Sequence, residues 1–209
     1  MKNKKTYVLI VSINFPKTHK RAGAPTGFPT SIIFEIKKHT LRKNYPLWKK
    51  RVDEINAGRA VLSVRYWEGL PYRSKQCECI EFSRLGIQKL QYKHFNYNEN
   101  HHFLIDDLES PLRMPELAIN DGLLLDDFQE WFKPMPTEPM AIIHFTDNFT
   151  YPVADPFMQR KIEECRAGKH IKRKWVSTGE DSGRLDHEET ANAEECIFCN
   201  GKYIYLSES

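Results

Sequence analysis

Residues 37–42 read Lys37-Lys38-His39-Thr40-Leu41-Arg42, and they follow directly on an apolar segment, residues 31–36. In an extended chain the side chains alternate between two faces with a period of two. Thr40 and Arg42 then share one face, whereas Lys37 joins them only if the chain turns just after it. The stretch therefore predicts either a basic surface loop or a site at which an amine, a hydroxyl and a guanidinium converge.

The composition predicts a folded chain in a reducing, cytoplasmic setting. The 209 residues are 40% hydrophobic and 12% aromatic, which suits one domain with a real core plus an appendage. The apolar run at residues 7–11 is short and lacks a small-residue cleavage site, so it predicts a first strand rather than a signal peptide. No apolar run reaches the ~18 residues of a membrane-spanning helix. The five cysteines, an odd number, indicate no disulfide framework.

The charge is distributed unevenly along the chain. Residues 1–51 contain thirteen Lys and Arg and a single acid, Glu35, so this part carries +12 and the remainder −9. Such polarity indicates a basic face for a polyanion such as nucleic acid. The alternative is a surface on which these charges are balanced once the chain has folded.

Outward from residues 37–42, the pattern predicts alternating strands and helices. A strand at 7–14 leads into a long loop, 16–30, rich in proline and basic residues. A helix from Pro46 to Gly58 is followed by a hairpin of two strands, at 60–67 and 75–82, with 86–91 as a third strand of the same meander. Further signals predict helical segments at 112–119 and 126–132 and a closing strand at 140–146.

The composition changes after residue 151. Residues 156–165 have a helical pattern, whereas 178–195 are acidic, contain few apolar residues and are expected to be disordered. Cys196 and Cys199 form half of a zinc ribbon, but the other half is missing, so no metal site and no cofactor are predicted. The predicted organisation is one domain over 1–150 and a C-terminal extension over 151–209, through which the protein could bind a protein partner.

The order of these elements resembles the ASCH domain, a family of the PUA-like superfamily. The resemblance covers residues 5–150 and is carried by Lys37, Thr40, Arg42, Gly58, Ala118-Ile119-Asn120-Asp121-Gly122, Phe128 and the strand 142–145. It implies an α+β fold, in which a PUA-like β-barrel of mostly antiparallel, curved sheet is flanked by helices, with a cleft beside residues 37–42. It also implies binding of RNA or of a modified nucleotide or nucleoside.

One bacterial branch of this family resembles amidohydrolases that remove the acetyl group from acetylcytidine. The resemblance carries the catalytic roles onto Lys37, Thr40 and Asp121, although the family has a glutamate where this chain has the shorter Asp121. Thr40 is a poor nucleophile unless a base takes its proton, and Lys37 becomes a base only if its pKa falls. The alternative is a binding site in which Lys37 and Arg42 hold a phosphate while Thr40 donates a hydrogen bond.

Aromatic and basic residues gather around the predicted turn at 68–71. Cations hold the backbone of unpaired nucleotides while aromatic rings stack on their bases. The predicted nucleic-acid-binding residues are Lys38, Arg42, Arg65, Trp67, Tyr72, Arg73 and Lys75. The competing interpretation places Trp67 in the core, because one of the two alternating faces of its strand must point inward.

The sequence thus predicts a cytoplasmic RNA- or nucleotide-binding protein without a membrane anchor. Two other functions stay open. One is an amidohydrolase of an acylated nucleobase or nucleoside, and the other is a protein-interaction module that acts through the C-terminal extension.

Overall fold

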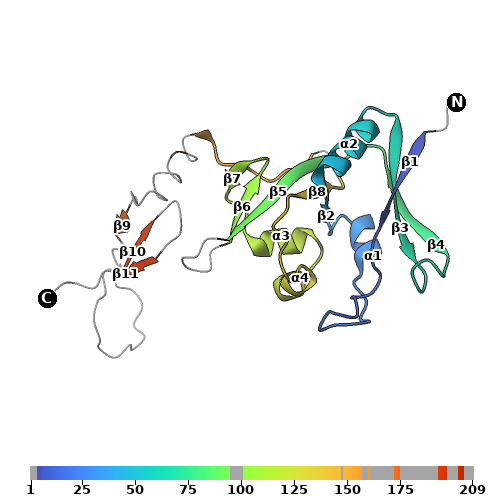
Figure 1. Cartoon of the computed structure of the whole chain (residues 1–209), viewed down its shortest axis with the longest axis horizontal. Coiled ribbons are helices and arrows are strands. Elements are labelled where there is room, and N and C mark those ends of the chain that lie inside the picture. Colours follow the sequence, from blue (N-terminus) through green and yellow to red (C-terminus); the bar gives the residue numbers. More distant parts are fainter. Residues whose placement is uncertain are drawn as a thin grey trace. The chain divides into compact units, whose positions relative to one another are not determined.

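The computed structural model describes residues 4–94, 101–146, 148–156, 160, 172–174, 193–196 and 202–204 (Figure 1). The chain forms two compact units, Met1–Val153 and Ala154–Ser209. The first unit contains two sheets, four helices and the candidate site.

The first sheet has the strand order β1-β3-β4. It is formed by β1 (Lys5–Ile10), β3 (Ala60–Trp67) and β4 (Gln76–Phe82). The predicted hairpin of β3 and β4 is antiparallel, with an irregularity in register between Val64 and Arg65. The amino-terminal strand β1 lies parallel to β3, which leaves β1 at one edge of this sheet.

The second sheet is antiparallel throughout and has the order β2-β8-β5-β6-β7. Its strands are β2 (His39–Lys43), β8 (Met140–His144), β5 (Gly86–His94), β6 (His101–Ile105) and β7 (Leu108–Ser110). All five residues of β8 are buried, as expected for an apolar strand between two neighbours. The prediction that 86–91 continues the β3–β4 meander is wrong, because β5 pairs with β8 and β6 instead.

The predicted α+β class with mostly antiparallel strands is confirmed, but barrel closure is not seen in the strand pairing. Among the described strands, each sheet has two free edges, and β1 and β2 lie at such edges. Helix α2 (Tyr45–Asn56) joins the two sheets, because it packs against β3 of the first and against β5 and β8 of the second. Asn44 caps it by accepting a hydrogen bond from the Leu47 amide.

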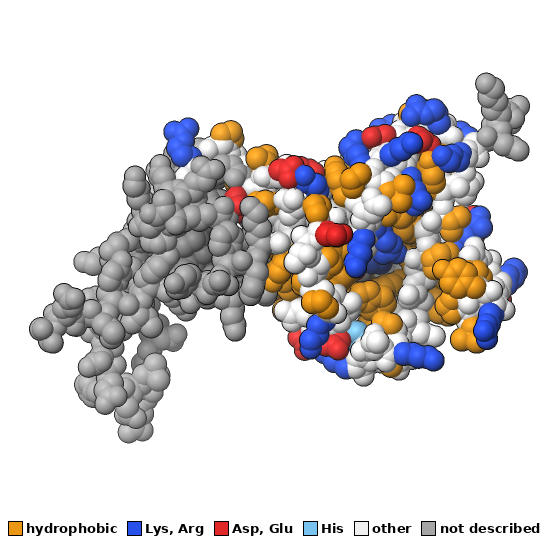
Figure 2. All heavy atoms as spheres, viewed as in Figure 1, with side chains coloured by type: hydrophobic (Ala, Val, Ile, Leu, Met, Phe, Trp, Pro, Cys, Tyr) orange, Lys and Arg blue, Asp and Glu red, His pale blue; other side chains and the backbone are white. Residues whose placement is uncertain are grey.

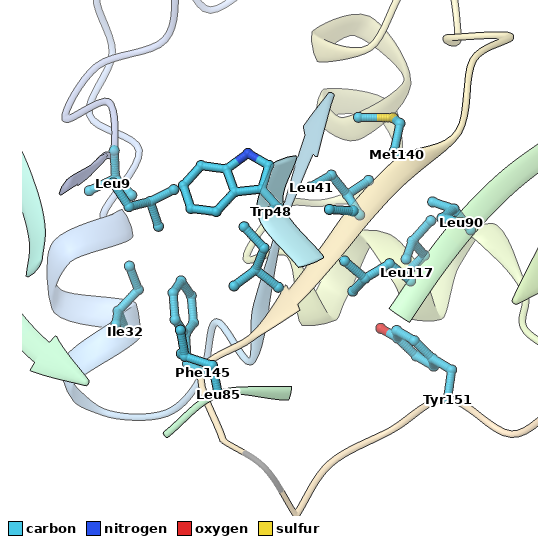
Figure 3. Close-up of a cluster of buried hydrophobic side chains, with 14 of the residues drawn as sticks. Leu9, Ile32, Leu41, Trp48, Leu85, Leu90, Leu117, Met140, Phe145 and Tyr151 are labelled. Atoms are coloured by element: carbon cyan, nitrogen blue, oxygen red, sulfur yellow. The ribbon is translucent and has the colours of Figure 1, made fainter. Parts of the chain in front are cut away.

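The core of the first unit is continuous across both sheets. Figure 3 shows part of it, from Leu9 on β1 to Leu90 on β5 and to Tyr151. Trp48 of α2 is buried in this cluster together with Val52 and Ile55, as expected for residues that recur at helical spacing on one face. The short helices α3 (Met114–Asn120) and α4 (Leu125–Trp131) pack against each other.

The long loop after β1 is held firmly against α4. His19 Nε2 lies 3.1 Å from the Asp127 carbonyl oxygen, and the Arg21 guanidinium donates to the Asp127 carboxylate at 2.5 Å. The Phe15 ring packs edge-on against Trp131, with a centroid distance of 5.6 Å. The predicted loop at 16–30 is shorter than expected, because Phe28–Ile33 form helix α1.

The second unit contains a small antiparallel sheet with the order β11-β10-β9. Its strands are β9 (Lys172–Lys174), β10 (Ala193–Cys196) and β11 (Lys202–Ile204). Residues 193–195, which were expected to be disordered, lie in β10. Most of the predicted helix 156–165, most of the acidic stretch and the side chains of Cys196 and Cys199 lie outside the described residues. No helix in the described part of the chain is long and apolar enough to cross a membrane.

Candidate functional site

A cavity of about 300 Å³ lies where the edge strands of the two sheets come close together. The end of β1 forms one wall, β2 forms another, and the starts or ends of α1, α3 and α4 complete it. The lining residues are Ile10, Val11, Ser12, Phe28, Lys37, Thr40, Leu41, Arg42, Asp121, Trp131 and Phe132. All three predicted catalytic residues therefore lie at one cavity, together with Arg42.

Lys37 reaches the cavity because the chain turns sharply between α1 and β2. Glu35 adopts a left-handed backbone conformation with φ 57°, and the amide of Lys37 donates to the Ser31 carbonyl at 3.0 Å. Gly122, with φ 76°, lies directly against the aliphatic part of Lys37. A Cβ at this glycine would come within 3.2 Å of Lys37 Cβ. The turn predicted just after Lys37 therefore lies just before it, and a glycine from a distant segment makes room for its side chain.

The Lys37 amine is paired with Asp121. Lys37 Nζ donates to Asp121 Oδ1 at 2.8 Å and also to the Asp121 backbone carbonyl, and it lies 4.3 Å from the centroid of the Phe28 ring. Lys37 is 2% exposed and Asp121 4%. Burial lowers the pKa of Lys37 and raises that of Asp121, whereas their mutual attraction opposes both shifts. Each charge is therefore stable in the interior only because the other is present.

Arg42 connects Thr40 to the edge of the other sheet. Its Nη1 donates to Thr40 Oγ1 at 2.9 Å, and its Nη2 donates to the Ile10 carbonyl oxygen at 2.9 Å. Thr40 is buried and accepts this hydrogen bond, while its own hydroxyl hydrogen has no acceptor among the described residues. The predicted common face of Thr40 and Arg42 on an extended strand is confirmed.

One expected contact is missing from the site. The enzymatic hypothesis expects the Lys37 amine within hydrogen-bond reach of the Thr40 hydroxyl, or somewhat farther away when no ligand is bound, and no hydrogen bond joins these two described side chains. The physical reason is that the amine has a carboxylate and a carbonyl as better acceptors, both on Asp121. Thr40 is paired with Arg42 instead.

Behind Asp121 lies a buried polar chain that the sequence did not reveal. The Tyr151 hydroxyl accepts a hydrogen bond from Asn120 Nδ2 at 3.0 Å. The hydrogen of this hydroxyl is then donated to His39 Nε2, which lies 2.7 Å away. The imidazole hydrogen of His39 is then on Nδ1, which lies 3.6 Å from Asp121 Oδ1 and has no hydrogen-bond partner among the described residues. Burial and the nearby Lys37 charge hold the pKa of His39 well below its usual range, so the ring is neutral.

No periodicity marks His39 or Tyr151 as part of the site. His39 lies inside the K-x-x-T-x-R stretch, between two residues that were singled out, and Tyr151 follows the last predicted strand of the domain. The sequence offers one signal for this polar chain, which is that Asn120, the donor to the Tyr151 hydroxyl, is adjacent to Asp121.

A second and larger hollow adjoins the cavity. This groove, of about 700 Å³, is lined by residues 10–17 and 67–72, and it shares Ile10, Val11 and Ser12 with the cavity. Trp67 and Tyr72 lie on its hairpin side with ring centroids 5.3 Å apart. Figure 2 shows Lys and Arg side chains interspersed with exposed hydrophobic ones over one face of the first unit.

The other predicted nucleic-acid-binding residues are placed differently. Arg73 and Lys75 are exposed beside Tyr72. Arg65 is turned along its own sheet, where Nε donates to Ser63 Oγ at 2.8 Å and Nη2 lies 3.7 Å from Glu78. Lys38 Nζ lies over the Phe149 ring, 5.2 Å from its centroid, and does not line the cavity or the groove.

Folding neutralises part of the basic amino-terminal segment. Acidic residues from α2 and from the region of α3 and α4 form ion pairs with five of its cations, which are Lys5, Lys20, Arg21, Lys37 and Lys49. The polarity of the sequence therefore overstates the basic character of the folded surface. No group of three or more His, Cys, Asp or Glu suited to a metal ion occurs within the described residues.

No family model, no curated protein and no solved structure matches this chain. Its resemblance to the ASCH domain therefore stays a prediction.

Proposed function

We propose that this protein is a cytoplasmic RNA- or nucleotide-binding protein whose cavity holds a nucleobase or nucleoside. The observation that carries this proposal is the convergence of the Lys37–Asp121 pair, the Thr40 hydroxyl and the Arg42 guanidinium on one cavity. Its volume, about 300 Å³, lies at the lower end of the range for small-molecule sites, where a few polar groups fix a ligand between apolar walls.

The remaining walls suit a planar heterocycle. Phe28 and Trp131, whose ring centroids lie 5.6 Å apart, offer aromatic surface, and Phe132 adds a third ring. A base presents donors and acceptors along its edge, which Thr40 and Asp121 can meet with a free hydroxyl hydrogen and a carboxylate. Replacing a buried ion pair by apolar residues is often neutral or stabilising, so stability alone does not explain this lysine and aspartate. Perturbed pKa values of this kind cluster at functional sites.

The resemblance to the ASCH domain supports the same proposal and extends it to the fold. We infer that the two sheets are the two parts of a PUA-like barrel. The hydrogen bond from Arg42 to the Ile10 carbonyl supports this, because it joins the two edge strands between which a barrel would close.

Calorimetric titration with the four ribonucleosides and their 5′-monophosphates tests the binding function. We expect the full-length chain to bind at least one of them, and the double variant Lys37→Met/Asp121→Leu to lose that binding while it stays folded. Lys49→Met is the matched control, because Lys49 makes an exposed pair with Asp53 on α2 and does not line the cavity. Equal affinity in the wild type and the double variant would reject the cavity as the binding site.

A second candidate, an amidohydrolase of an acylated nucleoside, is favoured by the free hydroxyl hydrogen of Thr40 beside a lysine with lowered pKa. Thr40 Oγ1 would attack the acyl carbonyl and give its proton to the amine of Lys37 in its neutral form. That proton would pass to the leaving amine, and water would release the acid from the acyl-threonine. Because the Lys37 amine faces Asp121 in the structure, this step requires the amine to turn when the substrate binds.

Turnover of acetylcytidine to cytidine and acetate tests this second candidate. Chromatography should show the reaction with the wild type and no reaction with Thr40→Val, which keeps the shape of the side chain but lacks the hydroxyl. Unchanged turnover in Thr40→Val would exclude Thr40 as the nucleophile, while nucleoside binding without turnover would leave the binding function alone.

A further inference from the structure

The turn between β3 and β4, at one side of the groove, has an exposed aromatic residue, Tyr72, at its tip. Tyr72 is 90% exposed and adopts a left-handed backbone conformation with φ 63°, which is uncommon for a residue with a bulky side chain. The tip is held in shape by hydrogen bonds, from Ser74 Oγ to the Leu70 carbonyl at 3.0 Å and from the Glu68 amide to the Lys75 carbonyl at 3.1 Å. The Tyr72 ring is thus presented to solvent on an ordered turn.

Trp67 gives this ring a partner and fixes its position at the groove. The two centroids lie 5.3 Å apart with their planes inclined at 52°, so at least one face of the exposed ring stays open. Aromatic faces of this kind bind unpaired bases without regard to sequence, because every base has a π-face.

The charges around the groove favour a polyanion over an apolar peptide. Lys17 on one side and Arg73 and Lys75 on the other are exposed, and none of them forms an ion pair within the described residues. Five other cations of the basic segment are paired with acids. Glu68 is the acidic residue of the groove lining, and its Oε1 accepts a hydrogen bond from Cys77 Sγ at 3.0 Å.

The groove and the cavity adjoin each other, because Ile10, Val11 and Ser12 line both. The groove is therefore the neighbouring hollow for a ligand chain with one base in the cavity, and it leads to Trp67 and Tyr72. A free nucleoside would leave the groove empty.

We propose that the groove lined by residues 10–17 and 67–72 holds the nucleotide next to the one in the cavity, so that the ligand is single-stranded RNA rather than a free nucleoside. The base of this second nucleotide stacks on Tyr72, and its phosphates lie near Lys17, Arg73 and Lys75. This inference rests on the proposed function, since the cavity supplies the first nucleotide position.

The test compares a ribonucleoside 5′-monophosphate with an unstructured tetraribonucleotide on the full-length protein. We expect the tetranucleotide to bind the wild type more tightly. Tyr72→Ala should weaken it by about 5- to 150-fold, the equivalent of losing one stacked base, and leave the affinity for the monophosphate unchanged. Phe34→Ala is the matched control, because Phe34 is also an exposed aromatic residue, at 71%, but does not line the groove or the cavity.

The outcomes separate this inference from the proposed function. A tetranucleotide that binds no more tightly than the monophosphate, or that binds Tyr72→Ala as well as wild type, overturns the groove while the cavity stands. Loss of tetranucleotide binding in Tyr72→Ala, but not in Lys37→Met/Asp121→Leu, supports RNA binding by the groove and overturns the cavity as the first position. No binding of either ligand by the wild type overturns both. An apolar peptide that binds the groove more tightly than the tetranucleotide also overturns the inference.

Discussion

The Lys37–Asp121 pair should cost far more to break than to replace. In Lys37→Met the aspartate keeps its burial, at 4% exposure, but loses the ammonium that balances it. Removing one partner of a buried ion pair costs about 3–5 kcal/mol, whereas replacing both partners by apolar residues of similar volume is often neutral or stabilising. Because burial already raises the pKa of Asp121, protonation of its carboxylate in the variant removes part of this cost. We therefore expect a loss of about 3 kcal/mol for the single variant.

Urea unfolding at pH 7 and 25 °C measures this cost. With an m-value of about 2 kcal/mol per molar urea, a loss of about 3 kcal/mol lowers the midpoint by about 1.5 M. The double variant Lys37→Met/Asp121→Leu should return to within about 1 kcal/mol of the wild type. In the control, Lys49→Met removes an exposed pair with Asp53, which is worth only about 0.3–0.5 kcal/mol.

Two results would refute this reasoning. One is a midpoint for Lys37→Met that matches the exposed control, because the pair would then not be isolated from water. The other is a double variant less stable than Lys37→Met, because the pair would then be kept for stability rather than for binding.

Three further predictions concern the surroundings of the pair. Burial lowers the pKa of His144 from 6.5 to about 4, so the unfolded chain binds a proton that the folded chain does not. The neutral ring therefore costs no stability above pH 6.5, whereas the free energy of unfolding falls by about 3 kcal/mol as the pH drops to 4. Urea midpoints across this range should fall less steeply in His144→Gln than in wild type. Tyr151→Phe leaves His39 Nε2 without its donor and should cost about 1–3 kcal/mol, with a change in the imidazole ¹⁵N shifts that report the tautomer; unchanged shifts would contradict the hydrogen-bond assignment. Gly122→Ala should destabilise the protein more than Gly23→Ala, because both glycines have a similar positive φ, 76° and 78°, but an added Cβ meets other atoms only at Gly122; equal unfolding midpoints would contradict this close packing.

The sequence was informative where the signal is local. The strand with Thr40 and Arg42 on one face and the helix that buries Trp48 follow from periodicities of two and 3.6 residues. The pairing of β1 with β3 does not, because it joins segments separated by α1, β2 and α2, and no local pattern encodes such a partner. Helix α1 was missed because glycine and proline dominate the composition just before it.

The same distinction explains the candidate site. The spacing of residues 37–42, together with the resemblance, predicted which side chains would meet. It did not predict that the Lys37 amine prefers Asp121 to Thr40, since this depends on how closely Gly122 lets a distant turn approach. The link from Asp121 through His39 to Tyr151 is a contact between segments far apart in the chain, and only the three-dimensional structure brings them together.

The most direct test of the cavity as a base-binding site is the detection of intermolecular nuclear Overhauser effects at saturating nucleotide. We expect cross-peaks between base protons of the bound ligand and the ring protons of Phe28 and Trp131, which line the cavity. These cross-peaks should be absent in the folded double variant Lys37→Met/Asp121→Leu. Cross-peaks from a bound base only to residues outside the cavity, or an unchanged pattern in the double variant, would contradict base binding in the cavity.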